Sequence, residues 1–195
     1  MLEVFGYTSG VLMILSAIPY TRSILQLKTK PHRVTWFIWT VLIFIALFSQ
    51  FAKGGTWSLL LTIGDGIAIL IVFILSFKYG TGGFKKIDII SLFGAGVSLI
   101  LWYLTKEPAV VLFLIILIDI IGLNLTVMKT WKNPENENWV GWGLCAIGGF
   151  FGILSVGVLN LTLLSYPVYI FLANLLMTVI ILARRNYKKY NTKNT

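Results

Sequence analysis

Residues 31–39 read PHRVTWFIW, and residues 134–142 read PENENWVGW. The two stretches share a proline and two tryptophans at identical spacing, 103 residues apart: Pro31, Trp36 and Trp39, then Pro134, Trp139 and Trp142. Each stretch follows the polar, basic end of one apolar segment and leads into the next segment. Self-similarity of this kind predicts an internal duplication in which the same turn is built twice.

The chain is too apolar for an ordinary soluble domain. Of its 195 residues, 57% are hydrophobic and 12% are charged, and the mean hydropathy is +0.87. A helix needs about 20 apolar residues to cross the roughly 30 Å hydrocarbon core of a bilayer. Seven segments approach that length: Phe5–Leu27, Thr35–Phe51, Trp57–Phe77, Ile87–Leu104, Val110–Trp131, Trp139–Val158 and Leu163–Leu182. Barrel strands would alternate apolar and polar residues instead, so these runs predict an all-α integral membrane protein with seven transmembrane helices.

The basic residues gather on one side of the predicted membrane. The net charge is +9. Connections at one end carry fourteen Lys or Arg: Arg22, Lys28, Lys30, Arg33, Lys78, Lys85, Lys86, Lys129, Lys132, Arg184, Arg185, Lys188, Lys189 and Lys193. The other end carries Lys53 and Lys106. Basic residues near short loops stay in the cytoplasm, so we expect the N-terminus outside and the C-terminus in the cytoplasm. Membrane topology, and not nucleic-acid binding, explains the positive charge.

The direction of the two repeats follows from the same assignment. Both copies of the repeated turn fall on the cytoplasmic side, so the repeats are parallel and an odd number of helices must separate them. The fourth apolar segment supplies that helix. We predict a first three-helix bundle over residues 1–79, a linker helix within residues 80–108, and a second three-helix bundle with a basic tail over residues 109–195. Thr35 and Asn138 are the predicted caps of the helices that follow the repeated turn.

The end of the first segment reads IPYTRSILQLKTK over residues 18–30. It resembles the first-helix signature of the SWEET sugar transporters and the wider PQ-loop superfamily, a proline followed by a basic helix end. The resemblance implies the same three-one-three parallel arrangement with an outside N-terminus, and a carrier for a sugar. Tyr20 replaces the signature glutamine, and Gly122 stands at the second-repeat counterpart of Pro19. Nicotinamide riboside transporters share this architecture and use tryptophan pairs, which keeps a vitamin-like solute open.

Four strongly polar residues lie within the predicted spans: Asp65, Asp119, Asn124 and Asn174. A carboxylate at that depth is costly unless it faces the bundle interior or water, so we predict that these residues bind substrate. Asp65 lies between Gly64 and Gly66, which permit close approach of a ligand or a helix. In SWEET-like proteins a polar residue from the third and from the seventh helix contacts the sugar, so the resemblance implies Asp65 and Asn174 as that pair. The alternative is that these side chains only hydrogen-bond between helices.

Two tryptophan pairs lie at the start of the second and sixth predicted helices. Trp36 and Trp39 are one turn apart and share a face, as are Trp139 and Trp142. In one interpretation all four form an aromatic belt at the membrane interface. In the other, the deeper Trp39 and Trp142 bind substrate, as stacking walls or a cytoplasmic gate for a ring-shaped solute.

The predicted function is a membrane carrier that moves a small polar solute, a sugar or a nucleoside-like compound, by alternating access around a midplane site between the repeats. Pro19 and Pro167 are the predicted hinges, because proline removes a backbone hydrogen bond from a helix. No nucleophile, base and orienting residue cluster in the sequence, so we expect no enzyme activity, no cofactor and no metal site. A PQ-loop-type receptor that binds a ligand without transport stays open, as does assembly into a homo-oligomer.

Overall fold

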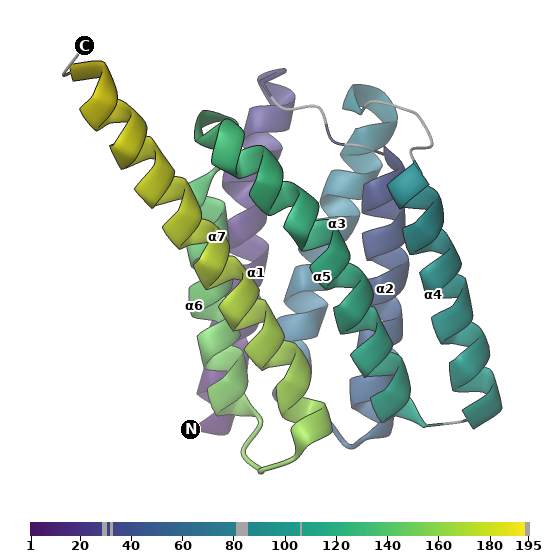
Figure 1. Ribbon diagram of the computed structural model, residues 1–195. Helices are drawn as coiled ribbons and strands as arrows, with labels where there is room; N and C mark the ends of the chain where they lie inside the picture. The colour runs from purple at the N-terminus through teal and green to yellow at the C-terminus, as the bar shows by residue number, and fades with distance from the viewer. Residues whose placement is uncertain (29–30, 32, 81–85, 106, 194–195) are drawn as a thin grey trace.

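The computed structural model describes residues 1–28, 31, 33–80, 86–105 and 107–193. Within these residues the chain forms no strand and seven α-helices (Figure 1): α1 (Leu2–Leu25), α2 (Arg33–Ala52), α3 (Leu59–Tyr79), α4 (Lys86–Thr105), α5 (Pro108–Lys132), α6 (Trp139–Ser155) and α7 (Leu161–Lys193). A short 3-10 turn, η1 (Pro134–Asn136), precedes α6. For the described ranges, the predicted all-helical class and the number of helices are confirmed.

The outer surface of the bundle is apolar. The helices α1 and α3 and the Leu161–Asn191 part of α7 are long and apolar enough to cross a membrane. On α3 the side chains of Ile63, Ile67, Ile71 and Ile74 are exposed, three or four residues apart along one face. A stripe of exposed isoleucines is suited to lipid and not to water. The chain is therefore a helical membrane protein, as predicted.

Several predicted helix boundaries are wrong, among them the end of α6 and the start of α2. The helix α6 ends at Ser155 and not at Val158, because Gly157 adopts a positive φ of 74° and ends the helix in the left-handed conformation. The helix α2 begins at Arg33, so the predicted cap Thr35 lies inside the helix.

The helix α7 extends beyond its predicted end at Leu182 and continues to Lys193. Its last turns are polar and basic. Apolar residues mark the part of a helix that lies in hydrocarbon, whereas the helix itself can continue into the polar region. The apolar pattern therefore predicted the apolar part of α7 and missed the polar turns that extend it.

Asn138 is the predicted N-cap of α6, and the structure confirms it. Its side-chain oxygen accepts hydrogen bonds from the backbone N–H groups of Val140, at 3.0 Å, and Gly141, at 3.2 Å. Because Asn138→Ala removes that acceptor, we expect it to lower the free energy of unfolding by about 1 kcal/mol. Asn138→Asp keeps an acceptor oxygen and should stay within about 0.5 kcal/mol of the native protein. Unfolding in detergent measures both variants, and equal losses would contradict the capping role.

The helices α3 and α7 each pack against two others from their own half of the chain. In the first half α3 packs against both α1 and α2, and in the second half α7 packs against both α5 and α6. The halves meet chiefly where α1 packs on α6 and where α2 packs on α5. The helix α4 packs along α2 and α5 and lies at one edge, and the two termini lie at opposite ends of the bundle (Figure 1).

Glycines allow α1 and α3 to pack with their backbones in contact. A Cβ atom added to Gly64 would lie 2.4 Å from the carbonyl oxygen of Gly10, and one added to Gly6 would lie 2.6 Å from the carbonyl oxygen of Trp57. Small residues at such contacts are a main means by which membrane helices associate. The buried apolar core around this contact draws side chains from five helices, among them Met13, Leu42, Leu61, Leu112 and Ile170.

Candidate functional site

Asp65 faces the interior of the bundle from α3. It lies two residues, or about 200° around the helix, from both Ile63 and Ile67, which are exposed on the outer face. Its Oδ2 atom accepts a hydrogen bond of 3.2 Å from the hydroxyl of Tyr166 on α7. Tyr166 is only 6% exposed. The first of the predicted acids therefore faces protein and not lipid.

Asp119 faces the interior from α5 in the same way. Ile115 and Leu112, four and seven residues earlier on the same face of the helix, are both buried. The hydroxyl of Tyr169 on α7 donates a hydrogen bond of 2.5 Å to Oδ2 of Asp119. Each predicted acid thus has a tyrosine partner on the same helix, α7.

These four side chains form one polar group, which we call the acid–tyrosine cluster: Asp65, Asp119, Tyr166 and Tyr169. The two tyrosines are three residues apart, so they lie about one turn apart on a single face of α7. The carboxylates of Asp65 and Asp119 interact electrostatically with each other. The thiol of Cys145 on α6 lies within electrostatic range of Asp65. Side chains from α3, α5 and α7 therefore form the cluster, and Cys145 of α6 lies in its electrostatic field.

The cluster can form hydrogen bonds with a polar partner. An ionised carboxylate accepts hydrogen bonds at two oxygens, and a tyrosine hydroxyl both donates and accepts. Among the described residues, neither carboxylate forms an ion pair, and no three His, Cys, Asp or Glu side chains converge to hold a metal. Both acids are partly buried and not fully enclosed. The arrangement can therefore receive hydroxyl, amine or amide groups from a solute.

Asp65 and Asn174, the pair implied by the family resemblance, do not lie opposite each other in the structure. Asn174 lies eight residues beyond Tyr166, or about 12 Å further along α7. It is buried, and its side-chain amide donates a hydrogen bond of 2.7 Å to the carbonyl of Ile170 on its own helix. Asn124 belongs to α5, but its side chain lies outside the described part of the structure. Asp119, and not Asn174, is the predicted polar residue that lies beside Asp65.

The tryptophan pairs lie near the end of the bundle that carries the C-terminus. The ring of Trp36 meets that of Trp39 edge to face, with centroids 5.0 Å apart, and also contacts Tyr20 of α1 at 5.4 Å. Trp39 packs against the apolar core. The indole N–H of Trp142 donates a hydrogen bond of 3.3 Å to the carboxylate of Glu137. Trp39 and Trp142 are thus held by protein contacts, and their substrate-binding role stays a prediction.

Both predicted hinge prolines lie inside helices. Pro19 is in α1, and its ring packs near Gly141 of α6. Pro167 is buried in α7, directly after Tyr166 and two residues before Tyr169. A proline in a helix interior leaves a carbonyl without its usual backbone partner and favours a bend there. Pro167 thus lies between the two tyrosines of the cluster along α7, and its role as a hinge stays a prediction.

Sequence reasoning missed Tyr166 and Tyr169. The repeat itself offered a signal, because the offset of 103 residues that relates the two turns places the counterpart of Asp65 at Val168, between the two tyrosines. The same offset makes Asn174 the counterpart of Ile71, which is exposed on the outer face of α3. Adding the same 103 residues to positions in the third predicted helix would have pointed to the two tyrosines of the seventh.

Comparison of the chain with protein-family models, with curated proteins and with solved structures gives no match. The function must therefore be inferred from the geometry of the acid–tyrosine cluster and from the arrangement of the helices around it.

Proposed function

We propose that the chain is a membrane carrier for a small polar solute, most simply a sugar, that works by alternating access around the acid–tyrosine cluster. The observation that carries this proposal is the convergence of Asp65 from the first half of the chain with Asp119, Tyr166 and Tyr169 from the second half. Ionisable groups are costly within an apolar bundle and often mark pathways and binding sites there. In the free protein the acids and phenols satisfy one another, and solute hydroxyls would replace those contacts.

The neighbour relations among the helices support two equivalent three-helix units. If α1, α2 and α3 correspond to α5, α6 and α7, then the α1–α6 contact corresponds to α5–α2, and both contacts occur. The third helix of each unit also packs between the other two. A parallel duplication with α4 as the linker accounts for both relations. Rocking of one unit against the other would then open the cluster to each side in turn.

The placement of charge supports an outside N-terminus. The end of the bundle that carries the C-terminus holds the basic ends of α1, α3, α5 and α7 (Figure 1). At the opposite end, Lys53 is paired with Glu107, with 2.6 Å between Nζ and Oε1, and this contact lowers the pKa of the Glu107 carboxyl. Since this pair is neutral, it adds no net positive charge to that end, in keeping with the contrast that the lysine and arginine counts indicate. Basic ends face the cytoplasm in most membrane proteins.

Uptake into liposomes tests the proposal. The purified protein, reconstituted in liposomes, should accelerate entry of at least one member of a panel of sugars and nucleosides over that in protein-free liposomes. A nucleoside that is transported in preference to every sugar would favour the vitamin-like alternative. A solute that binds and stabilises the protein but does not cross would favour the receptor alternative. Absence of flux for the whole panel, under gradients in both directions, would overturn the carrier proposal.

A further inference from the structure

The cytoplasm-facing end of α7 carries a basic depression that the transport proposal does not use. It has a volume of about 460 Å³ and is lined by Glu135, Arg185, Asn186, Lys188 and Lys189. Three of its five residues are basic and one is acidic, so the depression has a net positive charge. It lies where the last turns of α7 pass the 3-10 turn η1 and the end of α5.

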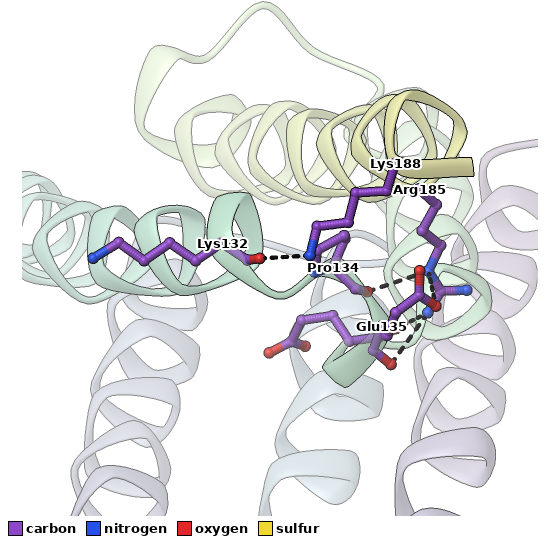
Figure 2. Close-up of polar contacts among 6 residues, drawn as sticks. Lys132, Pro134, Glu135, Arg185 and Lys188 are labelled. Atoms are coloured by element: carbon purple, nitrogen blue, oxygen red, sulfur yellow. Dashed lines mark hydrogen bonds and ion pairs between the residues drawn. The ribbon is translucent and has the colours of Figure 1, made fainter. Parts of the chain in front are cut away.

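The walls of the depression are fixed by hydrogen bonds from α7 to backbone carbonyls (Figure 2). Arg185 donates to the carbonyl of Pro134 at 3.2 Å and to that of Glu137 at 2.7 Å, and it pairs with the Glu135 carboxylate at 3.5 Å. Lys188 donates to the carbonyl of Lys132 at 2.8 Å. These contacts hold the side chains of Arg185 and Lys188 in place, and the lining keeps its net positive charge because it has three basic residues and one acidic residue.

The depth of the depression matches the headgroup layer of a bilayer. The exposed aliphatic side chains of α7 end at Leu182. Residues 185 to 189 follow about 4 to 10 Å further along the helix axis, and α7 is inclined to the bundle, which brings them closer to the hydrocarbon edge (Figure 1). The polar layer on each side of a bilayer is about 5 to 8 Å thick. The lining residues therefore lie at the level of lipid phosphates.

Aromatic side chains mark the same level on either side of the depression. The Arg184 guanidinium lies 4.7 Å from the centre of the Trp131 ring and 5.2 Å from that of Tyr187. Both rings are more than half exposed. Tryptophan and tyrosine prefer the membrane interface, so this group fixes the end of α7 at the lipid boundary.

We propose that the depression binds a phosphate group, supplied by the headgroup of an anionic phospholipid in the cytoplasmic leaflet. Lys188 and Lys189 provide the charge that recognises the phosphate, and Arg185 holds the wall. Basic pockets beside transmembrane helices are suited to anionic headgroups because the phosphate stays at the polar boundary while its acyl chains pack on the apolar helix. The exposed side chains of Val179 and Leu182, just below the depression, offer that apolar surface.

Native mass spectrometry of the full-length protein, titrated in detergent with phosphatidylglycerol or phosphatidylcholine, tests this site. The native protein should retain phosphatidylglycerol in clear preference. The double variant Lys188→Gln with Lys189→Gln should weaken that binding about 30-fold, since each basic side chain near an anionic headgroup contributes about five-fold. The matched control, Lys28→Gln with Lys78→Gln, removes the same charge at the same end of the bundle away from the depression and should change binding less than three-fold.

Three outcomes would overturn the proposal. Equal weakening by the two double variants would mean that diffuse charge, and not this depression, attracts the lipid. Equal retention of both lipids by the native protein would mean that the phosphate is not recognised as part of an anionic headgroup. Displacement of phosphatidylglycerol by an equal concentration of inorganic phosphate would assign the depression to a free anion. The last two measurements use the native protein, so the test does not depend on the variants folding, and Lys189→Gln alone provides a milder variant.

Discussion

Gly64→Ala is expected to lower the free energy of unfolding by about 1 to 2 kcal/mol. The added Cβ would lie 2.4 Å from the carbonyl oxygen and 2.9 Å from the Cα atom of Gly10. Both are backbone atoms, so no side chain can turn aside, and α1 and α3 must separate. Overpacking of this kind typically costs about 1 to 3 kcal/mol, and the effect exceeds the gain of up to about 1 kcal/mol from replacing glycine by alanine in a helix.

Gly66→Ala is the matched control for this prediction. It makes the same change two residues away on α3, on the other side of Asp65. Its Cβ would lie 3.5 Å from the nearest atom, Cγ1 of Ile43, which is an ordinary contact. This variant should therefore be neutral or more stable than the native protein by up to about 1 kcal/mol. Unfolding in detergent measures both, and a Gly64→Ala protein as stable as Gly66→Ala would mean that α1 and α3 are not in backbone contact.

The fold could be predicted from the sequence because lipid imposes a simple requirement on it. A segment that crosses hydrocarbon must be helical and apolar over its whole length, so seven apolar runs predict seven helices. Polar residues next to the apolar runs also predicted some helix ends correctly. Asn138 was recognisable as a cap because a short polar side chain precedes an apolar helix, whereas Thr35 occupies a similar place in the sequence and lies inside α2. The apolar pattern does not distinguish these two cases.

The candidate site could be predicted only in part. Asp65 and Asp119 stand out because a carboxylate in an apolar run has few structural reasons to be there. Tyr166 and Tyr169 do not stand out, since tyrosine is common in spans and at interfaces. Which residues face one another depends on the axial position of each helix relative to its neighbours. Asn174 lies about 12 Å along α7 from Tyr166, and composition alone does not reveal that difference in level.

Asp65→Asn is expected to reduce solute uptake about 10-fold to 100-fold in the liposome assay, if the chain is the proposed carrier. The substitution keeps the size of the side chain but replaces one acceptor oxygen with a donor and removes the charge. Hydrogen bonds to a charged group contribute about 1.5 to 3 kcal/mol each, which corresponds to that range in affinity. Asp119→Asn should have an effect of the same order, because its carboxylate holds the equivalent place beside Tyr169.

A loss of uptake identifies a binding role only if the protein stays folded. Asp65→Asn should keep or raise the unfolding temperature, since a neutral amide is less costly than a carboxylate in a bundle interior. Glu3→Gln is the matched control, because it removes one negative charge from the exposed first turn of α1 and should leave uptake unchanged. If Asp65→Asn lowered uptake only as far as it lowered the folded fraction, the cluster would be a contact between helices and not a solute site. Full uptake in Asp65→Asn and Asp119→Asn together would remove the acid–tyrosine cluster from the transport pathway, because no other pair of acids joins the two halves of the described bundle.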